Sequence, residues 1–207
     1  MDEQFLVLAR QLTEVGLRFD HRGWVLGTSG NFSALISRNP LRLAITPSGA
    51  SKGELTSNDI LEIDEHCVVV NARAGRPSAE ALLHLEIVRQ RGPAAVLHTH
   101  SVWSTVLSER HSSNEGLAIE GYEMLKGLEG VSTHAHREWI PILENDQDME
   151  RLAHAVREVL LRQPACHAFL LRRHGLYTWG ETLPQAVRHV EIVEFLLEAI
   201  GRDRMLG

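Results

Sequence analysis

The sequence contains little cysteine and no long apolar run. Its two cysteines, Cys67 and Cys166, are far apart and lack metal-binding spacing, so we interpret them as small buried residues of a reducing compartment. No stretch reaches the roughly 18 apolar residues that a membrane span needs. Residues 1–4 are acidic and lack the basic and apolar parts of a signal peptide. We therefore expect a cytoplasmic protein that makes no membrane contact.

Basic residues are too few to suggest a nucleic-acid surface. The chain has 21 Lys and Arg residues against 27 Asp and Glu residues, a net charge of −6, and no basic cluster. Because nucleic-acid-binding proteins normally present a basic patch, we expect no nucleic-acid partner. With 43% hydrophobic residues in 207, the chain can fill one substantial core, and we expect a single domain over residues 1–207.

Hydrophobic periodicity predicts alternating helices and strands. Helices are expected at 3–20, 79–91, 102–106, 120–127, 149–160 and 184–200, and strands at 41–45, 68–70, 94–99 and twice within 167–180. Gly92 is expected to end the second helix and Gly201 the last one. Pro141 limits residues 139–143 to an edge strand, and residues 108–120 show no regular pattern. These elements predict an α/β fold.

The apolar stretch at residues 94–101 ends in two histidines, one residue apart. Side chains alternate along a strand, so His98 and His100 face the same side and lie about 6.6 Å apart along it. Imidazole nitrogens bind zinc at about 2.0–2.1 Å, so both side chains can reach one ion between them. The alternative interpretation is a pair of solvated histidines at the end of a strand.

Five separated motifs together resemble the class II aldolase/adducin family. They are residues 30–33 (Gly-Asn-Phe-Ser), 46–49 (Thr-Pro-Ser-Gly), 77–80 (Pro-Ser-Ala-Glu), 98–101 (His-Thr-His-Ser) and 173–180 (Arg-His-Gly-Leu-Tyr-Thr-Trp-Gly). Their order and approximate spacing follow the family over nearly the whole chain. The resemblance implies an α/β/α sandwich with a mainly antiparallel central sheet. It also implies a ring of four subunits, so we expect a homotetramer.

The resemblance further implies one zinc ion per subunit, bound by His98, His100 and His174. Three neutral imidazoles leave a coordination position open for substrate, which is typical of catalytic zinc. For His174 alone, the alternative is an ordinary turn histidine beside Gly175.

Two loops of small residues are suited to the phosphate of a small-molecule sugar phosphate. The candidate donors are Thr28, Ser29, Gly30, Asn31, Ser48, Gly49 and Ser78. Backbone N–H groups in such loops can converge on an anion, and Ser78 is expected to open a helix whose N-terminus favours negative charge. Each loop alone is also compatible with an ordinary turn. Lys52 either adds positive charge here or is a solvated lysine.

Two carboxylates are candidates for moving protons. Glu80 matches the acid of the family's aldolases, whereas Glu123, followed by Met-Leu-Lys-Gly, matches its dehydratases. Residues 28–30, 142–145 and 172–175 also resemble the dehydratases of methionine salvage, so we predict sugar-phosphate dehydration by Glu123, with Glu80 as the alternative. We expect burial to raise the pKa of Glu123 toward neutrality. The alternative functions are retro-aldol cleavage and a non-catalytic, adducin-like oligomerisation module, which the intact histidine triplet disfavours.

Overall fold

The computed structural model describes residues 3–71 and 73–206, and its centre is one eight-stranded sheet of order β3-β2-β1-β4-β8-β7-β6-β5. The strands are β1 (Asn31–Arg38), β2 (Leu41–Ile45), β3 (Leu61–Asp64), β4 (Ala95–Thr99), β5 (Gly116–Ile119), β6 (Glu138–Leu143), β7 (Ala168–Leu171) and β8 (Gly175–Gly180). The helices are α1 (Glu3–His21), α2 (Ala81–Arg91), α3 (Val102–Arg110), α4 (Met149–Arg162) and α5 (Leu183–Leu206), with 3-10 turns η1 (Ser112–Asn114) and η2 (Glu123–Gly127). None of the helices in these ranges is long and apolar enough to cross a membrane.

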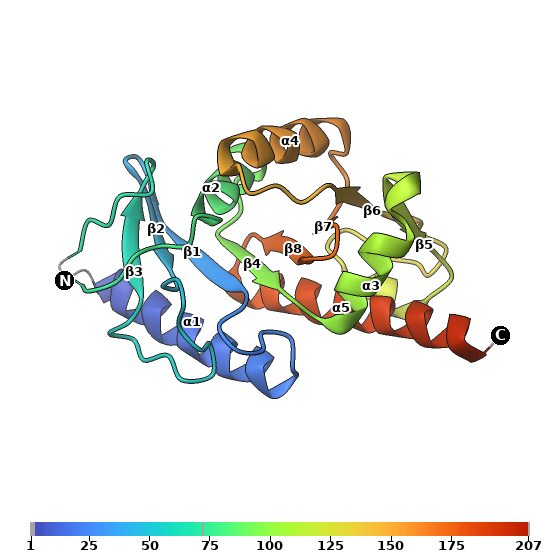
Figure 1. Ribbon diagram of the computed structural model, residues 1–207, viewed down its shortest axis with the longest axis horizontal. Helices are drawn as coiled ribbons and strands as arrows, with labels where there is room; N and C mark the ends of the chain where they lie inside the picture. The colour runs from blue at the N-terminus through green and yellow to red at the C-terminus, as the bar shows by residue number, and fades with distance from the viewer. Residues whose placement is uncertain (1–2, 72, 207) are drawn as a thin grey trace.

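Helices cover both faces of the sheet (Figure 1), with α2 and α4 on one face and α1, α3 and α5 on the other. Alternation along β4 explains why both faces need a cover: Val96 enters the core beneath α2 and α4, whereas Ala95 and Leu97 enter the core beneath α1 and α5. Neighbouring strands are antiparallel except for β6 and β7. The expected α/β/α sandwich with a mainly antiparallel sheet is therefore confirmed.

Several element boundaries follow the sequence signals. Helix α1 buries Phe5 and Phe19 on its predicted apolar face. Helix α2 ends at Gly92, which has a left-handed conformation with φ of 65°. Ser101 caps α3 by accepting a hydrogen bond from the backbone N–H of Ser104. Neighbouring residues are sufficient to set these two helix ends, because each cap gives a hydrogen-bond partner to a backbone group that would otherwise lack one.

The prediction that Gly201 ends the last helix is wrong. Helix α5 continues through it to Leu206. A Cβ atom at position 201 would lie 2.2 Å from the ring of Trp103 on α3, so glycine here permits close packing of two helices. The sequence alone does not distinguish this use of glycine from a helix stop.

The strand predictions for three segments are also corrected. Strand β6 is not an edge strand, because it pairs with β5 on one side and β7 on the other. The N–H of Ile142 points toward the β5 side, where it donates to the carbonyl of Glu115. Neighbouring residues of a strand alternate, so the N–H that Pro141 lacks would point toward β7. The pairing of β6 with β7 begins only at Ile142, so Pro141 removes no hydrogen bond from it. Residues 116–119, expected to be irregular, form the edge strand β5, and residues 68–70 make only an isolated bridge at Val69.

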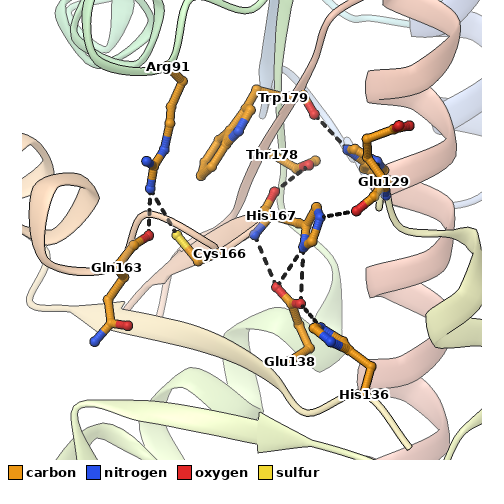
Figure 2. Close-up of polar contacts among 10 residues, drawn as sticks. Arg91, Glu129, His136, Glu138, Gln163, Cys166, His167, Thr178 and Trp179 are labelled. Atoms are coloured by element: carbon orange, nitrogen blue, oxygen red, sulfur yellow. Dashed lines mark hydrogen bonds and ion pairs between the residues drawn. The ribbon is translucent and has the colours of Figure 1, made fainter. Parts of the chain in front are cut away.

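The connection from η2 to β6 is held by histidines (Figure 2). The backbone carbonyl of Glu129 lies 2.8 Å from Nε2 of His167. The backbone N–H of Glu129 donates to Nε2 of His189 at 3.2 Å. Nδ1 of His189 in turn donates to the carbonyl of Trp179 at 2.7 Å. These contacts tie the segment that follows η2 to β8, to α5 and to the start of β7.

Candidate functional site

Three histidines and one glutamate converge at one end of the central strands. One nitrogen or oxygen atom from each of Glu80, His98, His100 and His174 lies within 4.8 Å of the others. Nε2 of His98 is 2.7 Å from Nε2 of His100, and Oε1 of Glu80 is 3.2 Å from Nε2 of His174 and 3.6 Å from Nε2 of His98. The structure therefore brings together the three predicted metal ligands and one of the two candidate acids.

Strand pairing positions these side chains. His98 on β4 is paired with Asn31 of β1 on one side and with Tyr177 of β8 on the other. His174 lies in the turn between β7 and β8, next to Gly175. A Cβ atom on Gly175 would lie 2.1 Å from the carbonyl oxygen of Thr99, so only glycine lets this turn approach the end of β4.

The surroundings of the histidines favour the neutral form that metal binding requires. Nδ1 of His98 faces the carbonyl oxygen of Leu176 at 2.9 Å, so Nδ1 carries the proton and the Nε2 lone pair faces the cluster. Burial, followed by the neighbouring His100 and His174, lowers the pKa of His98 well below its usual value. Burial also lowers the pKa of His100 to about 4, and it lowers the pKa of His174 against the opposing charge of Glu80.

The donor set fits a divalent cation. Three imidazole nitrogens and a carboxylate oxygen lie within 4.8 Å of one another, and imidazole-rich sites of this kind suit zinc and neighbouring transition metals. The outward hydrogen bond from Nδ1 of His98 to a backbone carbonyl is the support that metal-binding histidines commonly have. These four residues can therefore hold a metal ion.

Glu80 is oriented by a buried hydrogen-bond chain that the sequence analysis did not identify. Its Oε2 accepts from Nδ2 of Asn31 at 2.5 Å, and Oδ1 of Asn31 is hydrogen-bonded to Nε2 of His84. Nδ1 of His84 lies 2.7 Å from the hydroxyl of Ser33. Burial lowers the pKa of His84 to about 3, so its neutral ring donates to Asn31 and accepts from Ser33. In the sequence, only the four-residue spacing of Glu80 and His84 indicated that these two side chains lie near each other.

Tyr177 forms the wall behind His98. Its ring stacks on the His98 imidazole, with 3.9 Å between centroids, and on Phe169 at 4.9 Å. Burial, and then the nearby Glu80, raises the pKa of Tyr177 well above its usual value, so the phenol stays protonated. The stacked rings limit rotation of His98 without adding a charge.

A pocket of about 90 Å³ adjoins the cluster and unites the two small-residue loops. Its lining includes all seven predicted phosphate-site residues, Thr28, Ser29, Gly30, Asn31, Ser48, Gly49 and Ser78, together with Lys52, Glu80 and His100. Lys52 is buried, and its ammonium donates to the carbonyls of Thr28 and Ala50 at 2.9 and 2.7 Å. Burial lowers the pKa of Lys52 to about 8, although Glu80 opposes this change. The interpretation of Lys52 as a solvated residue is wrong.

The helix that Ser78 was expected to open begins two residues later than predicted. Helix α2 starts at Ala81, and residues 79–80 form a turn before it. The Ser78 hydroxyl accepts a hydrogen bond from the N–H of Glu80 at 3.3 Å, and its carbonyl accepts from the N–H of Ala81 at 3.0 Å. This turn places Ser78 and Glu80 on the same pocket.

Glu123 lies away from the histidine cluster of its own chain. It begins η2, its side chain is 71% exposed, and it accepts a hydrogen bond from Lys126 at 2.6 Å. The hydrogen bond from Lys126 lowers the pKa of Glu123, contrary to the expectation that burial would raise it. His134 is 3.7 Å from the same carboxylate. The structure thus groups Glu80 with the histidines and leaves Glu123 on the surface of the single chain.

Comparisons with known proteins identify the family of the chain. The family described as Class II Aldolase and Adducin N-terminal domain matches residues 10–200. The chain is 45% identical over 198 residues to a methylthioribulose-1-phosphate dehydratase from Methylococcus capsulatus (95% of this chain, 94% of the relative). It is 41% identical over 197 residues to a methylthioribulose-1-phosphate dehydratase from Marinobacter nauticus (94% of this chain, 93% of the relative).

Solved structures agree with this assignment. YgbL from Escherichia coli superposes with a TM-score of 0.79 at 25% identity, covering 98% of this chain and 91% of that one. An L-fuculose-1-phosphate aldolase from Thermus thermophilus gives a TM-score of 0.74 at 25% identity, covering 100% and 98%. The histidine cluster, the adjoining pocket and these matches lead to one conclusion: the chain belongs to the class II aldolase and adducin family.

Proposed function

We propose that this chain dehydrates 5-methylthioribulose 1-phosphate to 2,3-diketo-5-methylthiopentyl 1-phosphate, a step of methionine salvage. The observation that carries the proposal is the pocket in which the donors of two small-residue loops adjoin three histidines and a glutamate. The relatives named for this reaction align over nearly the whole chain. A phosphorylated ketose would place its phosphate in the pocket and its carbonyl end toward the histidines.

We further propose that the metal is zinc, one ion per subunit, held by His98, His100 and His174. Bound there, zinc supplies a Lewis acid that polarises oxygen atoms of the substrate. The lone pair of His98 already faces the cluster because its other ring nitrogen is engaged by the carbonyl of Leu176. Glu80 borders the same space and is itself oriented by Asn31.

The phosphate is assigned to the two loops and the start of α2. Ser48 and Gly49 come from the second loop, and Ser78 precedes α2. Backbone N–H groups and hydroxyls can surround an anion there. Lys52 contributes positive charge to this pocket and, through its bonds to the carbonyls of Thr28 and Ala50, also holds the two loops together.

Dehydration requires one base and one acid. A base removes the proton from C3, an acid protonates the hydroxyl that leaves C4 as water, and the resulting enol tautomerises to the diketone. We assign this proton transfer to Glu123, with Glu80 as the alternative. Glu80 lies beside the histidines, whereas Glu123 is exposed in the single chain, so in this proposal it acts in the site of a neighbouring subunit.

We further propose a homotetramer, the assembly that the family resemblance implies. Apolar side chains are exposed on adjacent helices α3 and α5, at Val102, Val106 and Phe195. Apolar surface of this kind is characteristic of an interface. Light scattering coupled to size-exclusion chromatography measures the mass directly, and a monomeric mass would contradict this proposal.

We assign the enzyme to the cytoplasm. Cys67 and Cys166 are both free thiols, and burial raises the pKa of each thiol. A protonated thiol is a poor nucleophile for disulfide exchange. Two unpaired thiols are compatible with the reducing environment of that compartment.

The second candidate function is retro-aldol cleavage of a sugar phosphate. The position of Glu80, 3.2 Å from His174, favours it because the family's aldolases resemble this chain at that residue. Mass spectrometry of the products from 5-methylthioribulose 1-phosphate separates the two reactions. Loss of one water supports dehydration, and two carbon fragments would support the aldolase. A chain without bound metal and without metal-dependent activity would instead indicate a scaffold.

A further inference from the structure

Glu194 is a carboxylic acid buried behind the histidine strand. It lies on α5, is 2% exposed, and its Oε1 accepts a hydrogen bond from the hydroxyl of Thr99 at 2.6 Å. Thr99 is the residue between His98 and His100, and strand alternation directs its side chain away from theirs. One hydrogen bond therefore joins α5 to the end of the strand that carries two of the proposed metal ligands.

The hydroxyl of Thr105 continues this connection toward His174. Ser101 follows His100, and its carbonyl oxygen lies 2.9 Å from the hydroxyl of Thr105. The same hydroxyl lies 3.1 Å from the carbonyl oxygen of His174, so it bridges the start of α3 and the turn before β8. The residue that follows β4 and His100 is therefore linked to the third histidine through Thr105.

The environment of Glu194 favours an uncharged hydrogen-bond acceptor. Its second oxygen, Oε2, is buried and has no hydrogen-bond partner within residues 3–71 and 73–206. Burial raises the pKa of Glu194 to about 7, against the lowering effect of the Ser101 and Thr99 hydroxyls, and the nearby Glu198 raises it further. Because an unpaired buried charge is costly, the contact does not depend on a carboxylate charge. A neutral amide of the same size can replace it.

We propose that Glu194 is a positioning residue for the metal centre. By accepting the hydrogen bond of Thr99 it holds the end of β4 so that His98 and His100 direct their nitrogens toward one ion. The inference rests on the proposed metal centre but not on the proposed dehydration. Groups that support metal ligands from outside contribute about 10- to 100-fold in metal affinity.

Zinc affinity of the full-length, metal-stripped chain tests this, measured by competition with a chromophoric chelator. Thr99→Val removes only the donor hydroxyl, Glu194→Leu removes the acceptor, and Glu194→Gln keeps an acceptor oxygen. We expect Thr99→Val and Glu194→Leu to weaken zinc binding by about 10- to 100-fold and Glu194→Gln to bind as the wild type does. Glu198→Gln, one turn further along α5, is the matched control and should also bind as the wild type does.

Wild-type zinc affinity in Thr99→Val would overturn the proposal, and this isosteric change decides the question even if Glu194→Leu does not fold. Equal loss in Glu194→Gln and Glu194→Leu would also overturn it, because a conservative acceptor would then not rescue the site. A wild-type chain that binds zinc but does not dehydrate the substrate contradicts only the proposed reaction. A wild-type chain without zinc affinity contradicts both the positioning role of Glu194 and the proposed zinc-dependent reaction.

Discussion

His167 lies against the buried carboxylate of Glu138, with 3.0 Å between its Nδ1 and Oε2 (Figure 2). Its other ring nitrogen, Nε2, is 2.8 Å from the carbonyl oxygen of Glu129. Both nitrogens therefore face acceptors, and only the imidazolium can donate to both. His136 lies 2.8 Å from the same carboxylate. This ion pair joins β6 to the start of β7 and to the segment that follows η2.

The ion pair makes stability depend on pH. Burial lowers the pKa of His167, but hydrogen bonding and charge attraction from Glu138 outweigh it, so the pKa is raised. Burial raises the pKa of Glu138, but His167 and His136 outweigh it, so the pKa is lowered. The stabilisation from His167 is complete below its unfolded pKa of about 6.5 and is lost as pH rises through the folded value. The stabilisation from Glu138 is complete above about pH 4.3 and is lost as pH falls through its folded value.

His167→Gln should therefore destabilise the chain most at mildly acidic pH. We expect the free energy of unfolding to fall by about 3 kcal/mol at pH 6, because Glu138 loses its charged partner, and by less at pH 9. Urea unfolding at both pH values, with metal removed by chelator, measures the difference. His154→Gln, an exposed change on α4, is the control. An equal loss at pH 6 and pH 9 would contradict the charged pair.

Removing any one proposed metal ligand should remove metal and activity together. His98→Ala, His100→Ala and His174→Ala each open the coordination shell and weaken binding. Metal content by plasma emission spectrometry and turnover of the same preparations provide the comparison, with the exposed His154→Ala as control. A variant with full metal occupancy and full turnover would exclude that histidine from the site.

Ser48→Asp should weaken substrate binding selectively. The new carboxylate would lie in the pocket between the two loops and repel the substrate phosphate, so we expect KM to rise about tenfold or more. Steady-state kinetics of the zinc-loaded enzyme measure this. Ser113→Asp makes the same charge change in the exposed turn η1 and should leave KM unchanged. An unchanged KM in Ser48→Asp would place the phosphate elsewhere.

Glu123→Gln and Glu80→Gln decide which carboxyl moves the proton. If Glu123 does, its amide variant keeps its size but cannot titrate, and kcat should fall by roughly 10²–10⁴-fold with metal content near wild type. Glu80→Gln should then cost less, because Glu80 orients the site. Single-turnover rates and metal analysis of both variants are the measurements. Near-normal kcat in Glu123→Gln beside an inactive Glu80→Gln would transfer the role to Glu80.

The sequence by itself determined those features that depend on neighbouring residues. Alternation and an apolar run predicted β4 and set His98 and His100 on one side of it, and Gly92 and Ser101 acted as the expected helix caps. The motif resemblance correctly indicated the family and the mainly antiparallel sandwich. Local hydrogen bonding and the two-residue period of a strand are readable without knowledge of partners.

Only the tertiary structure decided the features that depend on partners distant in the sequence. Gly201 lies within a helix and leaves room for the ring of Trp103, and β6 is internal because the irregular-looking residues 116–119 pair with it. The chain from His84 through Asn31 to Glu80 and the contact between Glu194 and Thr99 span 49 to 95 residues. Burial and pairing across such distances follow from how the sheet is ordered, which a local residue pattern does not encode.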